Sequence, residues 1–194
     1  MEIEIKYAPV SYETFAKIAL DLGLENEETV GMAADYLDTT DGYLSQNKIS
    51  VRNRGENGVS VYTMKCSLNN IEGIAVREEE EIATEDISVA FDHFAKNERL
   101  AQIVENIRQR QLVSIAKMEF IRKKYTVDIP GATVEISHDT GKMWGKNGGE
   151  GEILEMEIEL KKGDEKAFAL FLMSLEKYDL TIEKRSKLHR AKML

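Results

Sequence analysis

The chain has 194 residues, of which 42% are hydrophobic and 31% are charged, a composition typical of a globular protein. Its length accommodates one domain with a substantial core, and no stretch resembles a linker between domains, so we expect a single domain over residues 1–194. The formal net charge of −9 disfavours nucleic acid as a partner, because nucleic-acid binding depends on neutralising backbone phosphates.

Nothing in the sequence indicates a membrane protein. No apolar run approaches the roughly 20 residues that a membrane-spanning helix needs, so we expect no membrane partner. The N-terminus is acidic, whereas a secretory signal would be basic and then apolar. The single cysteine, Cys66, agrees with a reducing compartment, since it cannot form an intramolecular disulfide. We therefore expect a cytoplasmic protein.

The first predicted element is a β-strand over residues 2–6. Polar and apolar side chains alternate along it, and alternate side chains of a strand point to opposite faces. One face carries Glu2, Glu4 and Lys6, and the other carries two isoleucines. On an ordinary half-buried strand, the charged face would be exposed to solvent.

An amphipathic helix is predicted after this strand. Ser11 is a typical N-cap, an apolar stripe at helical spacing follows, and Gly23 is a typical residue just beyond a helix C-terminus. We interpret residues 24–29 as an acidic linker. A strand is predicted over residues 31–38, and it ends in a polar turn over residues 39–42.

The next segment predicts three strands. Residues 49–54 and 59–66 form two antiparallel strands, joined by a hairpin turn over residues 55–58 that contains an Asn-Gly pair. Asn69 and Asn70 are predicted to turn the chain into residues 73–83. The acidic run in this third stretch is also consistent with a solvated strand or a helix start.

The second half of the chain continues the alternation of helices and strands. Residues 88–95 and 98–107 show helical apolar spacing. Residues 112–129 are rich in β-branched and aromatic types and predict one long or bulged strand. A Pro-Gly turn leads into a strand over residues 133–139.

The C-terminal part starts with a glycine-rich segment over residues 141–151. We interpret it as a flexible hairpin loop, because it lacks the Lys-Ser/Thr ending of a phosphate loop. A strand over residues 152–161, a helix over residues 164–178 and a basic tail over residues 184–190 follow. About eight strands in antiparallel order predict an α+β protein built on a closed antiparallel β-barrel, with helices packed outside.

Charged side chains recur at alternate positions of several strands. They are Arg52 and Arg54; Arg77, Glu79 and Glu81; Arg122 and Lys124; and Glu155, Glu157 and Glu159. Rows of both signs on several strands indicate that the rows face one another in the barrel lumen. Buried charge is costly unless it is paired or bound to a ligand. Carboxylates suit Mg²⁺ or Mn²⁺ and arginines suit phosphate, so the lumen is predicted to bind both.

These motifs resemble, in order and spacing, the CYTH family, also called triphosphate tunnel metalloenzymes. The resemblance rests on Glu-x-Glu-x-Lys at residues 2–6, Tyr-Leu-Asp-Thr at 36–39, Arg-x-Arg at 52–54, Thr-x-Lys at 63–65, Arg-x-Glu-x-Glu at 77–81, Asp139, Glu-x-Glu-x-Glu at 155–159, and Arg-Ser-Lys at 185–187 with Arg190. It covers essentially the whole chain. One departure is Arg122-x-Lys124, where family members often show Lys-x-Arg.

The resemblance implies an eight-stranded antiparallel barrel whose lumen binds small triphosphate-containing substrates with Mg²⁺ or Mn²⁺. The implied metal ligands are Glu2, Glu4, Glu155, Glu157 and Glu159. The implied phosphate-binding residues are Lys6, Arg52, Arg54, Lys65, Arg77, Arg122, Lys124 and Lys187. The implied catalytic residues are Glu4, Lys6, Glu79, Glu81 and Asp139, of which the last three could bind a second metal, position water or orient basic residues.

This assignment favours a metal-dependent triphosphatase in which water attacks the terminal phosphorus. Inorganic triphosphate is the preferred substrate because the sequence shows no nucleoside pocket, and thiamine triphosphate and nucleoside triphosphates are alternatives. A class IV-type adenylyl cyclase is disfavoured, because family cyclases carry a His-Phe element upstream and here only Met1 precedes Glu2. A non-catalytic polyphosphate- or nucleotide-binding module is disfavoured by the intact pair Glu2 and Glu4. A homodimer is left open.

Overall fold

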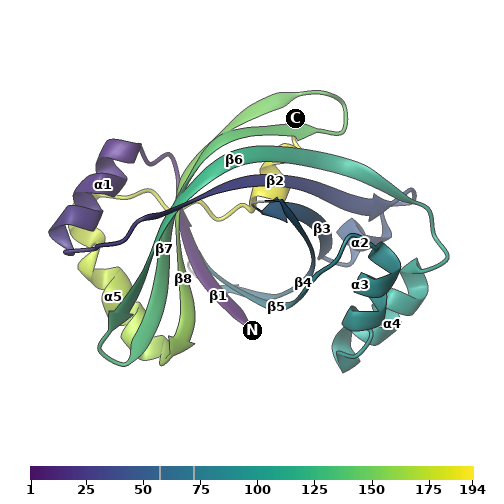
Figure 1. The fold of residues 1–194 in the computed structure, drawn as a ribbon, viewed down its shortest axis with the longest axis horizontal. Helices are drawn as coiled ribbons and strands as arrows, with labels where there is room; N and C mark the ends of the chain where they lie inside the picture. The colour runs from purple at the N-terminus through teal and green to yellow at the C-terminus, as the bar shows by residue number, and fades with distance from the viewer. Residues whose placement is uncertain (57, 72) are drawn as a thin grey trace.

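The computed structural model describes residues 1–56, 58–71 and 73–194 and contains a closed barrel of eight antiparallel strands (Figure 1). The strands are β1 (Glu2–Tyr7), β2 (Glu28–Thr39), β3 (Ile49–Glu56), β4 (Val59–Ile71), β5 (Ile74–Ala83), β6 (Leu112–Ile129), β7 (Ala132–Gly145) and β8 (Glu150–Gly163). Their order around the barrel is β1-β5-β4-β3-β2-β6-β7-β8. The predicted fold class, a closed eight-stranded antiparallel barrel with helices, is confirmed.

Strand β1 lies between β5 and β8 and sets the register of the charged rows. Glu2 pairs with Arg77 of β5, and Lys6 pairs with Glu157 of β8. Residues that are directly opposite in register point to the same face of the sheet. The pairing therefore places side chains of opposite charge next to one another on the same face of the sheet, along both edges of β1.

Helices cover two regions of the outer barrel surface. Helices α1 (Tyr12–Asp21) and α5 (Glu165–Ser174) pack with β1, β7 and β8 around a cluster that includes Phe15 and Phe168. Helices α2 (Tyr43–Gln46), α3 (Ile87–Phe94) and α4 (Glu98–Ile107) pack with β3 and β4 around Met64 and Phe94. Among the described residues, no helix is both long and apolar enough to cross a membrane.

A third hydrophobic cluster lies on the inner wall of the barrel and was not predicted. Met32 of β2 and Phe120 of β6 belong to this cluster and also line the central cavity. Helix α6 (Lys187–Ala191) packs against them through Leu188 and Ala191. The prediction of a basic tail over residues 184–190 was therefore incomplete, because its second half forms a helix that packs against the inner wall.

The segment that leads into α6 runs beside β1. The Ala8 amide donates to the Thr181 carbonyl at 3.0 Å, and the Glu183 amide donates to the Lys6 carbonyl at 2.8 Å. Arg185 donates from Nε and Nη2 to the Glu183 carboxylate at 2.9 and 2.6 Å. These hydrogen bonds lower the pKa of Glu183 to about 2.

We expect Glu183→Gln to lower the free energy of unfolding by about 0.5–1 kcal/mol at neutral pH, the range of a surface ion pair. The folded-state pKa of Glu183 is about 2 and its ordinary value is 4.5, so the ionised carboxylate stabilises the fold fully above pH 4.5. This contribution is lost as the pH falls from 4.5 toward 2. Denaturant unfolding of both proteins, followed down from neutral pH, measures it. A difference that is independent of pH would contradict the assignment.

Two predicted loop segments belong to strands. Strand β2 begins at Glu28, inside the segment over residues 24–29 that we interpreted as a linker, because Glu28 pairs with Lys124 of β6. Asn69 and Asn70 do not form the predicted turn but pair with β5. In both places hydrogen bonds to a neighbouring strand extend a strand through residues with low β-propensity.

The hairpin turn predicted over residues 55–58 includes Asn57, which lies outside the described residues. Gly55 and Glu56 are the last residues of β3, and Glu56 pairs with Val59 at the start of β4. The two strands that the turn was predicted to join are therefore adjacent and antiparallel, as expected.

The interpretation of residues 141–151 as a flexible loop was wrong. Strand β7 continues to Gly145 and β8 begins at Glu150, so most of these glycines lie in strands. A Cβ atom at Gly141 would lie only 2.1 Å from the Glu119 carbonyl oxygen and 2.5 Å from the Phe120 Cα atom. Glycine is needed here because two backbones approach closely, and flexibility is not its role.

We expect Gly141→Ala to lower the free energy of unfolding by about 1–3 kcal/mol, the usual cost of overpacking. The matched control is Gly31→Ala on β2, where an added Cβ atom would meet nothing within 4 Å. Denaturant unfolding of the two variants compares them directly. Equal stability of the variants would show that strand packing at Gly141 tolerates a methyl group.

Candidate active site

The barrel encloses a cavity of about 920 Å³, which is within the range of roughly 300–1,000 Å³ of small-molecule sites. The predicted site residues that line it are Glu2, Glu4, Lys6, Arg52, Arg54, Lys65, Arg77, Glu79, Glu81, Arg122, Lys124, Glu157, Glu159 and Lys187. Two predicted residues, Asp139 and Glu155, are completely buried and do not line it. The charged rows thus face the lumen, as the alternating pattern predicted.

The carboxylates of β1 are held by basic residues from β4 and β5. Glu2 accepts hydrogen bonds from Lys65 Nζ at 2.5 Å and from Arg77 Nη1 at 3.2 Å. The same Arg77 atom donates to Glu4 Oε1 at 2.5 Å, and Lys6 Nζ donates to that oxygen at 3.1 Å. Arg77 therefore connects the two carboxylates of the Glu-x-Glu-x-Lys motif.

The two carboxylates differ in how well their charge is compensated. Burial raises the pKa of Glu2, and the nearby carboxylates of Glu4 and Glu79 add to this effect. Burial also opposes ionisation of Glu4, but Lys6 and Arg77 outweigh it and lower the pKa of Glu4 to about 2. Lys65 and Arg77 thus do not fully offset the burial of Glu2, and a bound cation would favour its ionised form.

Arg52 and Arg54 of β3 are buried guanidinium groups that are only partly satisfied by hydrogen-bond acceptors. Arg52 Nη2 donates to Thr63 Oγ1 at 3.3 Å, and none of the ion pairs among the described residues includes Arg52. The Nε atoms of both arginines are buried without a hydrogen-bond partner in the described part of the chain. Burial and the charge of Arg52 lower the pKa of Arg54. Arg54 lies 3.1 Å from Glu56, so among the described residues it is Arg52 that has no carboxylate partner and that a bound anion would pair with.

The other predicted residues of β5 and β6 form ion pairs with residues of nearby strands of the same barrel wall. Lys65 lies 3.2 Å from Glu79, and Arg54 lies 3.7 Å from Glu81. Lys124 Nζ donates to Glu135 at 3.0 Å. Glu135 was not among the predicted site residues, although its position on the same face of the strand as Asp139 is a signal that could have found it.

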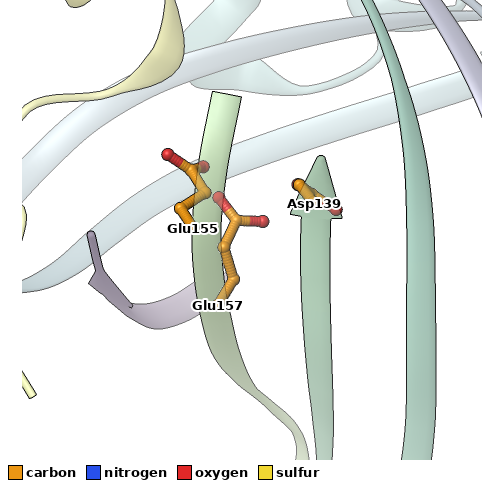
Figure 2. A group of neighbouring side chains, drawn as sticks. All are labelled: Asp139, Glu155 and Glu157. Carbon is orange, nitrogen blue, oxygen red and sulfur yellow. The ribbon is translucent and has the colours of Figure 1, made fainter. Parts of the chain in front are cut away.

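A group of acidic side chains lies close together on β7 and β8. Figure 2 shows Glu155 and Glu157 on β8 and Asp139 on the neighbouring strand β7. Each offers a carboxylate oxygen, and these oxygens lie within 4.8 Å of one another. Lys187 Nζ lies 2.7 Å from Asp139 and 2.9 Å from Glu157, and it also contacts Glu155. An ammonium group of the chain itself thus lies among these carboxylates.

Two arginines complete this acidic cluster. Arg122 donates to Asp139 through Nε at 2.8 Å and through Nη2 at 2.7 Å, and Arg190 contacts Glu155. Burial opposes the charge of Lys187, but the carboxylates around it outweigh burial and raise its pKa. Because Lys187 and Arg190 belong to α6, the cluster ties this helix to β7 and β8.

Residues 1–191 match the CYTH domain. The chain belongs to the CYTH family. The match spans nearly the whole sequence and confirms the resemblance of its motifs. Members of this family depend on divalent metal ions.

Solved CYTH-like structures share the fold. A putative adenylyl cyclase from Hippeastrum, described as having a dominant triphosphatase activity, is 20% identical and has a TM-score of 0.71, with 100% of this chain and 96% of that chain covered. A putative adenylate cyclase from Bacillus halodurans is 19% identical, with a TM-score of 0.60 and coverage of 98% and 96%. The RNA triphosphatase domain of a mimivirus mRNA capping enzyme is 11% identical, with a TM-score of 0.52 and coverage of 91% and 87%.

The carboxylates that line the lumen fit a divalent metal ion. They are hard oxygen donors of the kind that Mg²⁺ and Mn²⁺ prefer. Glu159 pairs with Glu4 across β1 and β8, and burial, with Glu2 nearby, raises its pKa. Glu2, Glu4 and Glu159 therefore form an acidic region of the lumen, although Lys65, Lys6, Arg77 and Lys161 already contact its carboxylates. Glu155 fits a metal less well, because Lys187 and Arg190 already contact it.

Proposed function

We propose that this protein is a divalent-metal-dependent hydrolase of triphosphate-containing substrates, with inorganic triphosphate as its preferred substrate. The observation that supports this most directly is the pair of guanidinium groups of Arg52 and Arg54, whose Nε atoms are buried without acceptors among the described residues. Burial raises the pKa of Glu2 and of Glu159, so a cation bound beside them would favour their ionised forms. A phosphate chain that carries a divalent cation would supply an acceptor for the arginines and a cation for the carboxylates together.

In this proposal Glu2, Glu4 and Glu159 hold Mg²⁺ or Mn²⁺, which when bound neutralises phosphate charge and acts as a Lewis acid. Arg52 and Arg54 donate forked hydrogen bonds to phosphate oxygens and stabilise the charge that develops on them. Because the positions of all these groups are fixed by paired strands, the substrate is oriented without reorganisation of the site.

The remaining predicted residues support this arrangement. Glu81 is 52% exposed at its side chain and lies 3.7 Å from Arg54, so it keeps an acceptor with which to position a water molecule. Glu79, paired with Lys65, holds that ammonium group toward the lumen. Asp139, bound through two hydrogen bonds to Arg122, orients its guanidinium group.

The substrate preference follows from the lining of the cavity. Among its described lining residues, Tyr36 and Phe120 are the only Phe, Tyr or Trp side chains, and each is only 8% exposed. They leave little surface on which a nucleobase or a thiazolium ring could stack. The cavity favours a substrate composed of phosphate groups alone.

One assay tests the proposal. The protein is incubated with Mg²⁺ or Mn²⁺ and with inorganic triphosphate, thiamine triphosphate or ATP, and phosphate, pyrophosphate and cyclic AMP are measured. Metal-dependent phosphate release, fastest from inorganic triphosphate, is the expected result. Pyrophosphate and cyclic AMP from ATP would instead establish an adenylyl cyclase. Binding of triphosphate without any product would establish a binding module.

A further inference from the structure

The two ends of the cavity differ in charge. Strand β3 runs from one end to the other, with Lys48 directly before it and Glu56 at its last position. The end near Lys48 is also lined by Lys184, Arg185 and Lys192, which flank α6. The end near Glu56 is lined by Glu81, Glu135 and Glu159, and the lysines there, Lys124 and Lys161, are paired with two of these carboxylates. We call Lys48, Lys184 and Lys192 together the basic mouth.

The cations of the basic mouth differ from those deeper in the lumen. Lys65 is paired there with both Glu2 and Glu79. No ion pair among the described residues includes Lys48, Lys184 or Lys192, and all three are exposed. Lys192 only donates a hydrogen bond to Ser45 Oγ at 2.7 Å. The basic mouth thus presents positive charge that the rest of the chain does not neutralise.

The backbone at Lys48 provides a second, independent observation. Lys48 follows Asn47, the C-cap of α2, and has a φ of +58°. Glycine or asparagine usually occupies this left-handed position, because a Cβ atom there is strained. A strained residue whose side chain lines a cavity is a sign of a functional role. A lysine thus occupies a position where glycine would fold with less strain.

We propose that the basic mouth is a subsite for phosphate groups that extend beyond the three held in the lumen, so that linear polyphosphates longer than triphosphate are bound through this end. This inference rests on the proposed function of the lumen. The described lining residues of the mouth include no Phe, Tyr or Trp on which a base could stack, and this favours polyphosphate over the 5′ end of an RNA. Unpaired lysines supply the point charges that bind successive phosphates.

Binding without turnover tests this subsite. The dissociation constants of tripolyphosphate and of a linear polyphosphate of about ten phosphates are measured by calorimetry without divalent metal. Lys48→Gly is expected to keep or raise Tm, since it relieves backbone strain. It should weaken binding of the long chain by about 3–10-fold and change that of tripolyphosphate by less than about 2-fold. Lys184→Glu with Lys192→Glu should cause a larger loss in the same direction.

The matched control is Asp179→Gly, which replaces another non-glycine residue of positive φ, +51°, that does not line the cavity. It should leave both dissociation constants unchanged. An equal loss of affinity for both ligands in Lys48→Gly, or no loss for either, would overturn the subsite. Binding of a 5′-triphosphorylated RNA oligonucleotide is measured with the same variants, and a loss of affinity for the RNA alone would also overturn the subsite. Unchanged binding of both ligands by the variants overturns this inference alone, whereas failure of both ligands to bind the unsubstituted protein overturns the proposed function as well.

Discussion

Glu4→Gln is expected to lower metal-dependent kcat/KM for inorganic triphosphate by at least roughly 100-fold, because Glu4 is a proposed metal ligand and such a ligand contributes several kcal/mol to charge stabilisation. Glu4 lies in the lumen, is buried and has a pKa of about 2, so it is ionised throughout the physiological pH range. Glutamine has the same shape but no charge. The measurement is phosphate release at varied Mg²⁺ and Mn²⁺ concentrations.

The matched control is Glu119→Gln, an exposed carboxylate on the outer face of β6. It removes one negative charge from the chain without altering the lumen, so its kcat/KM should remain within about 2-fold of the original value. Calorimetric titration with Mn²⁺ adds a readout that does not depend on turnover. Full activity and unchanged Mn²⁺ affinity of Glu4→Gln would remove Glu4 from the metal site.

The second large effect is expected at Lys187, which contacts three carboxylates of β7 and β8. Lys187→Met should lower the free energy of unfolding by about 3–5 kcal/mol, because removing one partner leaves buried charge uncompensated. For a chain of this length that loss corresponds to a fall in Tm of roughly 6–20 °C. Denaturant and thermal unfolding measure the two quantities.

Lys184→Met is the matched control, since Lys184 is exposed and lies three residues before Lys187. Its effect on stability should stay within about 0.5 kcal/mol. The pH dependence provides a second comparison. As the pH falls, protonation of the carboxylates that lose their partner in Lys187→Met should reduce the difference in free energy of unfolding between this variant and the original protein. A Lys187→Met protein as stable as the control would show that Arg122 and Arg190 suffice to neutralise the cluster.

The residues that line the lumen could be predicted because charged side chains recur at every second position of the strands. Glu2, Glu4 and Lys6 alternate with apolar residues, and so do Glu155, Glu157 and Glu159. A strand has only two faces, so alternation alone determines which side chains lie together. Once several strands carried such rows, a closed barrel was the arrangement that allowed the rows to neutralise one another.

Pairing partners could not be predicted in the same way. Nothing local to Lys187 distinguishes it from the other lysines of the basic tail, yet it alone contacts Asp139, Glu155 and Glu157. Gly141 similarly looks like a loop glycine, and its close contact with Glu119 appears only when β6 and β7 are paired. Both depend on contacts between residues far apart in the sequence.

The sequence by itself therefore determined the strands, their charged faces and the family to which the chain belongs, since each follows from local periodicity and motif order. The tertiary structure decided which charges are neutralised within the chain and which are left for a ligand. Closure of the barrel pairs Lys187 with the acidic cluster and leaves the Nε atoms of Arg52 and Arg54 buried with no acceptor in the part of the chain that the structure describes. The physical reason is that burial and ion pairing are properties of three-dimensional neighbours, which alternation along one strand does not specify.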